Sequence, residues 1–154
     1  MSEVADTEAN TSIIKIVIDT SVWISFLIGK ALNRIEDQLA KDNVVLLCSD
    51  ELFDEIFEVP HRPRIKKYIT DEQIFEIIAI IQTKSEWVTI QERTDICRDK
   101  KDNFLLDLAY NGKADYLVTG DQDLLVIGEY KNTKIMDFRE FDKRFSPPRK
   151  HQPS

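Results

Sequence analysis

Cysteine, histidine and long apolar runs are all scarce in this 154-residue sequence. Cys48 and Cys97 have no CxxC partner or neighbouring histidine, so they predict neither a disulfide framework nor a zinc site. Cys48 ends an apolar run, and we expect it to be a buried small side chain. The two histidines, His61 and His151, lack a triad context, which argues against histidine-based nucleophilic catalysis. No apolar run approaches the roughly 20 residues that span a bilayer, so we expect no membrane contact.

The two ends of the chain differ in composition from the part between them. Residues 1–12 are polar and lack the charged-then-apolar order of a secretory signal. With so few cysteines, this predicts a cytoplasmic protein. We expect residues 1–12 to form a flexible lead, residues 13–145 to fold as one domain, and the Pro-rich residues 146–154 to form a disordered tail.

Acidic residues outnumber basic ones, 28 against 21, which gives a formal net charge of −7. This balance argues against indiscriminate binding to nucleic acid. It leaves room for a local basic patch, and for an acidic cluster that a metal ion neutralises. Hydrophobic residues make up 42% of the chain and charged residues 32%, a profile typical of a soluble globular protein.

Apolar runs alternate with helical patterns along the chain. Predicted strands lie at Ile13–Asp19, Val44–Cys48, Trp87–Ile90, Tyr116–Thr119 and Lys134–Met136. Predicted helices lie at Ser21–Leu27, Leu32–Ala40, Asp50–Val59, Asp71–Thr83 and Asn103–Asn111, with a short helix after Asp121. The motifs "SDEL" and "TDEQ" are typical helix starts, and Gly112 is a typical helix stop. This alternation predicts an α/β fold, with a parallel sheet covered by helices on both faces.

Asp19 raises a specific question, because it is a bare carboxylate inside an otherwise apolar stretch. The three residues before it, 16–18, are all β-branched, which suits a strand buried on both faces. Apolar residues from Val22 to Leu27 then recur at helical spacing. Asp19 is therefore expected where a buried strand ends and a helix begins, which is the edge where parallel α/β sheets bind ligands.

Three further acids fall near the same predicted edge. Asp121 and Asp123 follow the fourth strand directly, and Asp102 opens the helix that leads into that strand. Since the carboxyl ends of parallel strands share one edge, these carboxylates are expected to converge. Ionised carboxylates held close together repel one another unless a cation lies between them. Oxygen ligands of this kind select Mg²⁺ or Mn²⁺.

A plain structural explanation exists for each of these residues. Asp19, Asp102 and Asp121 all stand where a helix cap is expected, and Asp is a preferred cap. Glu55 lies among Glu51, Asp54 and Glu58, a pattern that favours a solvated helix face. Periodicity alone does not choose among these acids.

Three stretches together resemble a PIN domain, over about Lys15 to Phe141. They are "IVIDTSVWISFLIGK", "SDELFDEIFEVPHRPRIKKYI" and "CRDKKDNFLLDLAYNGKADYLVTGDQDLL". They are most similar to the bacterial PIN-family toxin components of toxin–antitoxin systems, the VapC-like ribonucleases. This resemblance implies a three-layer α/β/α fold with a central, mainly parallel sheet of four to five strands.

The resemblance also implies a set of site residues. Asp19, Glu55, Asp102 and Asp121 match the family's four acids, and Asp123 is a further candidate ligand, so Mg²⁺ or Mn²⁺ is the implied cofactor. Thr20, Ser21 and Thr119 are candidates for orienting these carboxylates, although each would look the same as an ordinary cap or turn residue. Ser21 replaces the family's usual Asn, and Lys100 stands where Pro is common; we expect neither change to remove a ligand.

The implied function is a metal-dependent endoribonuclease that uses metal-activated water, as the toxin of a type II toxin–antitoxin system. A cognate antitoxin and a homodimer are the implied partners. For RNA binding, the stretch "HRPRIKKY" offers Arg62, Arg64, Lys66 and Lys67, although a solvated connector would look the same. The RNA target itself is not encoded in any visible motif.

Three other functions are alternatives, and the sequence argues against the first two. A haloacid-dehalogenase-type phosphatase needs a second acid two residues after Asp19, and Ser21 stands there. A receiver domain needs paired acids near the first strand and an Asp at the end of the third, where Ile90 stands. A PIN-like module that binds RNA or protein without cutting is the third alternative.

Overall fold

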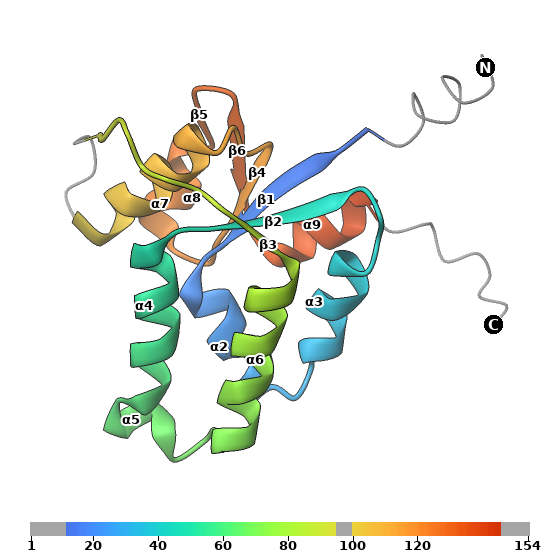
Figure 1. The fold of residues 1–154 in the computed structure, drawn as a ribbon, viewed down its shortest axis with the longest axis vertical. Coiled ribbons are helices and arrows are strands. Elements are labelled where there is room, and N and C mark those ends of the chain that lie inside the picture. The colour runs from blue at the N-terminus through green and yellow to red at the C-terminus, as the bar shows by residue number, and fades with distance from the viewer. Residues whose placement is uncertain (1–11, 95–99, 146–154) are drawn as a thin grey trace, which may run out of the picture.

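A six-stranded sheet forms the centre of the computed structural model, which describes residues 12–94 and 100–145 (Figure 1). The strand order is β3-β2-β1-β4-β6-β5. The strands are β1 (Ile14–Ile18), β2 (Val44–Cys48), β3 (Ser85–Trp87), β4 (Tyr116–Val118), β5 (Glu129–Tyr130) and β6 (Thr133–Met136). All neighbours pair in parallel except β5 and β6, which are antiparallel.

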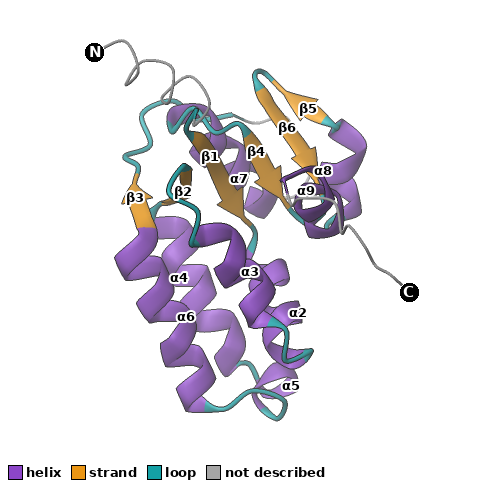
Figure 2. Ribbon diagram, turned by 90° about the vertical axis from the view of Figure 1, so that its right-hand side faces the viewer, coloured by secondary structure: helices purple, strands orange, loops and turns teal. Residues whose placement is uncertain are grey.

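Helices flank this sheet, and several of them extend beyond its carboxyl edge. They are α2 (Thr20–Ile28), α3 (Leu32–Leu39), α4 (Asp50–Glu58), α5 (Pro63–Lys66), α6 (Asp71–Lys84), α7 (Lys100–Asn111), α8 (Gln122–Ile127) and α9 (Phe138–Phe145), with a 3₁₀ turn η1 (Val59–His61). Figure 2 shows α2, α4, α5 and α6 gathered beyond the carboxyl ends of β1 and β4. The predicted α/β class with a mainly parallel sheet is confirmed. The sheet has one strand more than the expected four to five, because a two-residue β5 completes a hairpin with β6.

The central strand β1 is buried, as its β-branched sequence predicts. Ile16, Val17 and Ile18 are at most 1% exposed, because β2 and β4 pair on either side and helices cover the faces. Cys48 at the end of β2 is equally buried, and burial raises the pKa of its thiol to about 12. This thiol is therefore a packing group, as predicted.

Local signals set several helix ends. Ser49 caps α4 by accepting a hydrogen bond from the Leu52 amide at 3.3 Å. Thr70 and Gln73 form a reciprocal capping box at the start of α6. The predicted stop at Gly112 is confirmed, but the left-handed backbone falls on Lys113, whose φ is 57°. Gly112 is required for a different reason: a Cβ there would lie 2.8 Å from Leu47 Cδ1.

Some elements differ from their predictions. The third strand lies at Ser85–Trp87 and not at Trp87–Ile90, because α6 runs directly into an edge strand whose side chains are not buried. No periodic signal marks such a strand. The helix α9 was not predicted, although Phe138, Phe141 and Phe145 recur at helical spacing and pack against Tyr116 or one another.

Two predictions fall on residues outside the described part of the chain. The expected lead, residues 1–12, lies outside the described part except for Ser12, and the expected tail, residues 146–154, lies wholly outside it. Cys97 lies in the gap between residues 94 and 100. Among the helices that the structure describes, none has the length and apolar character needed to cross a membrane.

Candidate functional site

The carboxyl ends of β1 and β4 bring the first acid next to a buried hydroxyl group. Ile18 pairs with Val118, and the Asp19 amide continues the ladder by donating to the Val118 carbonyl at 2.9 Å. Asp19 and Thr119 therefore leave adjacent strands side by side. The Thr119 hydroxyl donates to Asp19 Oδ2 at 2.7 Å, although 100 residues separate the two in the sequence.

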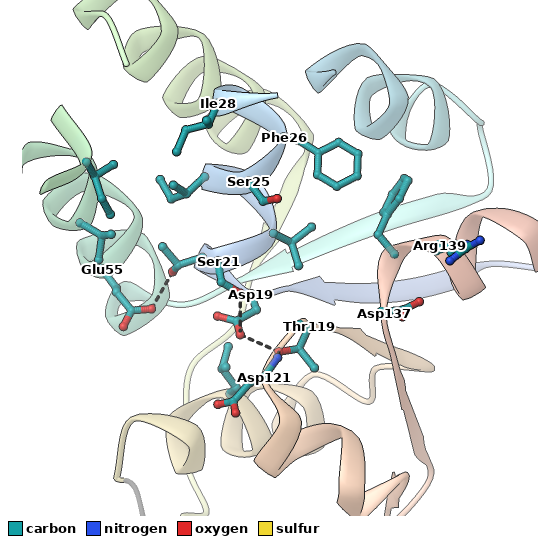
Figure 3. A pocket seen from close by; sticks show the side chains of 18 of the residues that line it. Asp19, Ser21, Ser25, Phe26, Ile28, Glu55, Thr119, Asp121, Asp137 and Arg139 are labelled. Carbon is teal, nitrogen blue, oxygen red and sulfur yellow. Dashed lines mark hydrogen bonds between the residues drawn. The ribbon is translucent and has the colours of Figure 1, made fainter. Parts of the chain in front are cut away.

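Asp19 is not explained by helix capping. It occupies the N-cap position of α2, but its carboxylate makes no capping hydrogen bond to the first turn. The backbone amides of Thr20 and Ser21 lower the pKa of Asp19, but neither forms the hydrogen bond of a helix cap with its side chain. Apart from Thr119, its other hydroxyl contact is the Ser21 Oγ, 3.4 Å from Oδ2. Asp19 is 8% exposed and lines the pocket shown in Figure 3.

A second group of acids lies at the end of β4. Asp102, Asp121 and Asp123 each offer a carboxylate oxygen, and these three oxygens lie within 4.8 Å of one another. Asp102 is buried, Asp121 half-buried and Asp123 exposed. Asp121 does cap α8, since it accepts a hydrogen bond from the Asp123 amide at 3.0 Å. Its own amide donates to the Thr119 Oγ1 at 3.0 Å, so one hydroxyl joins Asp121 to Asp19.

The fourth predicted acid arrives from helix α4. Thr20 donates to Glu55 Oε1 at 2.6 Å, which holds this half-buried carboxylate against the start of α2. Glu51, Asp54 and Glu58 on the same helix are exposed, as a solvated face predicts. Glu55 differs because it lines the same pocket as Asp19, Asp102 and Asp121 (Figure 3).

The surroundings of Asp19 disfavour its ionised form in the absence of a cation. Burial raises the pKa of Asp19, and the negative charge of Asp121 raises it further, while the hydrogen bond from Thr119 opposes them. A divalent cation would reverse this effect by stabilising the ionised carboxylates. The donors are carboxylate oxygens, which are the ligands that Mg²⁺ and Mn²⁺ prefer. The residues present therefore fit a divalent metal ion.

Four of these acids, Asp19, Glu55, Asp102 and Asp121, line a pocket of about 1120 Å³. Its floor is an exposed stripe of α2, formed by Ser21, Ser25 and Ile28. One wall comes from α4 and the segment after it and includes Glu55, Val59 and Ile65. The other wall contains Phe26, Arg34, Phe138 and Arg139, and Asp137 lies beside it.

Sequence reasoning missed three charged residues of this pocket: Arg34, Asp137 and Arg139. A signal did exist for Asp137. It directly follows β6, so the strand-end argument used for Asp19 and Asp121 would have marked it as well. It caps the start of α9 by accepting from the Glu140 amide at 2.8 Å. The two arginines carry no comparable signal, because only packing brings their helices together.

The predicted basic stretch does not enter the pocket. Arg62, Arg64, Lys66 and Lys67 are all exposed, and only Ile65 from this segment lines the pocket. Arg62 forms a two-point ion pair with Glu58, at 2.9 and 3.1 Å, and Lys66 pairs with Asp71 at 3.2 Å. Such surface ion pairs are also expected if the stretch is only a solvent-exposed connecting segment. RNA binding by this stretch therefore stays a prediction.

Comparison with known proteins places this geometry in a family. The PIN domain model matches residues 15–123, a range that contains Asp19, Glu55, Asp102, Asp121 and Asp123. An uncharacterised protein of Methanocaldococcus jannaschii is 33% identical over 126 residues, which cover 79% of this chain and 81% of that protein. PIN domains are typically metal-dependent nucleases. This chain belongs to the PIN domain family.

Proposed function

We propose that this protein is a metal-dependent endoribonuclease that hydrolyses RNA phosphodiester bonds. The observation that supports the proposal is one large pocket lined by four acids from distant parts of the chain, Asp19, Glu55, Asp102 and Asp121. Within it, Asp102 and Asp121 lie close enough to Asp123 for the three to share one ion. The four pocket acids come from the end of β1, from α4, from α7 and from the turn after β4. Membership of the PIN family removes the grounds for the phosphatase and receiver-domain alternatives.

The four acids would hold Mg²⁺ or Mn²⁺, with Asp123 as a further ligand. When bound, such an ion neutralises phosphate charge and lowers the pKa of water enough to supply hydroxide near neutral pH. The chain's own contribution is orientation. Thr119 holds Asp19 through Oδ2, and Thr20 holds Glu55 through Oε1, so both carboxylates stay in place before any ligand arrives.

The finer biological role that we propose is the toxin of a type II toxin–antitoxin system. It is supported by the resemblance of the three sequence stretches to VapC-like proteins. On this proposal, a cognate antitoxin covers the acidic pocket, by inserting an Arg or Lys beside the carboxylates, and the toxin is a homodimer. The competing proposal is a PIN-like module that binds RNA or protein without cutting it.

A cleavage assay separates these proposals. Wild-type protein and the Asp19→Asn variant are incubated with end-labelled structured and single-stranded RNAs, in Mg²⁺, in Mn²⁺ and in EDTA. The matched control is Asp54→Asn, which removes an exposed acid of α4 that does not line the pocket. We expect the wild type and the control to cleave only with metal, and Asp19→Asn to lose at least about 100-fold in rate.

Two outcomes would contradict the nuclease proposal. Equal cleavage by wild type and Asp19→Asn would show that the pocket acids are not responsible. Metal-independent RNA binding without cleavage in any condition would favour the non-catalytic module.

A further inference from the structure

The pocket continues well past the acids, and its far wall has a different chemistry. Figure 3 shows Phe26 and Arg139 on the side of α2 that faces away from Glu55. Arg34 and Phe138 line the same wall. The volume of about 1120 Å³ exceeds the roughly 300–1,000 Å³ of a small-molecule site, so there is room beyond a single scissile phosphate.

Arg34 is held in a defined position by aromatic rings. Its guanidinium carbon lies 5.9 Å from the centre of the Phe26 ring and 5.8 Å from that of Phe138, and the two rings meet edge to face at 4.8 Å. Such cation–π contacts fix the guanidinium without using its hydrogen-bond donors. One nitrogen is 3.1 Å from Asp142 Oδ2, which leaves other donors of the guanidinium for a ligand.

Packing between α3 and α9 brings the second arginine to the same wall. Asp142 of α9 also accepts from the Gln38 Nε2 of α3 at 2.6 Å, so this carboxylate joins α9 to α3. Arg139 lies nearly one turn before Asp142 on α9 and is exposed. Within the described residues Arg139 makes no ion pair, and the nearby acid Asp137 is engaged in capping α9.

We propose that Arg34 and Arg139 form a second subsite, which binds a phosphate of single-stranded RNA away from the bond being cut. The inference rests on the proposed nuclease function, because the acids take the scissile phosphate and the arginines take another phosphate of the same strand. Charge complementarity supports RNA as the occupant, because every linkage of RNA carries a negative charge. A metal ion would neutralise that charge beside the acids, and the two arginines neutralise it at the other wall. The half-buried ring of Phe26 offers an apolar contact for a base, as in other single-strand grooves.

The test compares Arg139→Ala with Lys143→Ala, which removes an equal charge from an exposed position of α9 outside the pocket. A second variant, Arg34→Gln, keeps most of the side-chain volume against the two rings. Binding of a fluorescein-labelled 12-nucleotide random single-stranded RNA is measured on the Asp19→Asn background, over a range of salt concentrations. Cleavage of the same RNA is measured on the wild-type background.

We expect Arg139→Ala and Arg34→Gln each to weaken binding by about tenfold. The slope of log K against log salt should fall by about 0.7 for each phosphate that the variant no longer neutralises. Lys143→Ala should retain affinity and slope. In cleavage, the two pocket variants should raise KM with little change in kcat, because the arginines bind away from the reacting bond. Arg139→Lys should recover part of the affinity.

Neutral methylphosphonate linkages, placed one at a time along the RNA, locate the bound phosphate. On the Asp19→Asn background, one position should weaken RNA binding when Arg139 is present and leave it unchanged in the Arg139→Ala variant. The subsite is overturned if the pocket variants match Lys143→Ala while the wild type still cleaves, and the nuclease proposal then stands. If nothing cleaves but Arg139→Ala still binds RNA less tightly, the nuclease proposal fails and the subsite remains. Equal competition by a poly-glutamate peptide, with no methylphosphonate effect, would overturn the RNA assignment in favour of an acidic peptide.

Discussion

Thr119 has no solvent exposure, yet its hydroxyl makes two of the hydrogen bonds that join the acidic site together. It donates to Asp19 and accepts from the Asp121 amide, so it sets the relative position of two strand-end carboxylates. Its hydrogen bond also lowers the pKa of Asp19, against the effect of burial. Thr119 therefore affects both the geometry of the two carboxylates and the pKa of Asp19.

The Thr119→Val variant tests this role, because valine keeps the shape and removes the hydroxyl. We expect RNA cleavage at limiting Mg²⁺ to fall by about 10- to 100-fold, with a higher Mg²⁺ concentration needed for half-maximal rate. Thr119→Ser, which retains the hydroxyl, is the control and should stay close to wild type. Wild-type Mg²⁺ dependence in Thr119→Val would show that the hydroxyl does not position the carboxylates.

Asp107 should make the stability of the folded protein depend on pH, independently of catalysis. It is buried, it accepts from the Thr94 amide at 2.6 Å, and Arg93 lies 3.7 Å away. Burial is the largest effect and raises the pKa of Asp107 above its ordinary value of 3.8, against the Thr94 hydrogen bond and the Arg93 charge. At pH values between the pKa of Asp107 in the unfolded chain and its higher pKa in the folded protein, the folded state binds more protons than the unfolded state. The free energy of unfolding therefore falls as pH rises through this range.

Asp107→Asn removes this titration while keeping an acceptor for Thr94. The free energy of unfolding of the variant minus that of wild type should therefore increase as pH rises above 3.8, and should level off once folded Asp107 is ionised. Urea unfolding of both proteins at closely spaced pH values from about 4 to about 7 measures it. A difference that stays constant or decreases across this range would contradict the assignment.

At the scale of elements, local sequence accounts for most of the helices and strands. The β-branched run of β1 and the caps of α4 and α6 are short-range signals, and the structure confirms them. The third strand was predicted at the wrong residues, and β5 was not predicted. Both lie at an edge of the sheet, where few side chains are buried, so their sequences lack the apolar pattern of a strand. Gly112 was correctly predicted to end a helix, but the structure needs a glycine there for a different reason. The chain packs too closely against β2 for a Cβ at this position.

Replacing Gly112 by alanine should destabilise the junction of α7 and β2. The added Cβ would lie 2.8 Å from Leu47 Cδ1 and 3.0 Å from Val88 Cγ2, so these side chains must shift. We expect a loss of about 1–3 kcal/mol in the free energy of unfolding. Gly120→Ala is the matched control, because no atom of the described residues lies within 4 Å of a Cβ there and φ is not positive. Equal denaturation midpoints for the two variants would refute the packing explanation.

For the whole molecule, the acidic site lies at the junction between the sheet and the helices beyond its edge. Distant parts of the chain meet there only in the folded state, so a divalent ion bound by them should stabilise folding. At a Mg²⁺ concentration of about 100 times Kd the expected gain is about 2.7 kcal/mol. Thermal unfolding in Mg²⁺ and in EDTA should show this gain in wild type and a much smaller one in Asp19→Asn. The same metal-induced shift in both proteins would place the ion elsewhere.

The order of strands and helices, and the acids at the ends of β1 and β4, follow from the sequence by itself. Periodicity and capping are local, and parallel strands bring their carboxyl ends to one edge, so the convergence of Asp19 and Asp121 needed no coordinates. The sequence pattern of α4 did not single out Glu55; the family resemblance did so before the fold was known.

The tertiary structure alone decided which side chains share the pocket with those acids. Glu55 faces inward because α4 packs beside α2, where Thr20 reaches it. Arg34 and Arg139 lie on one wall because Gln38 and Arg34 of α3 both bind Asp142 of α9, over 100 residues away. The rotation and packing of helices depend on contacts between distant segments, and no local pattern in a single sequence encodes them.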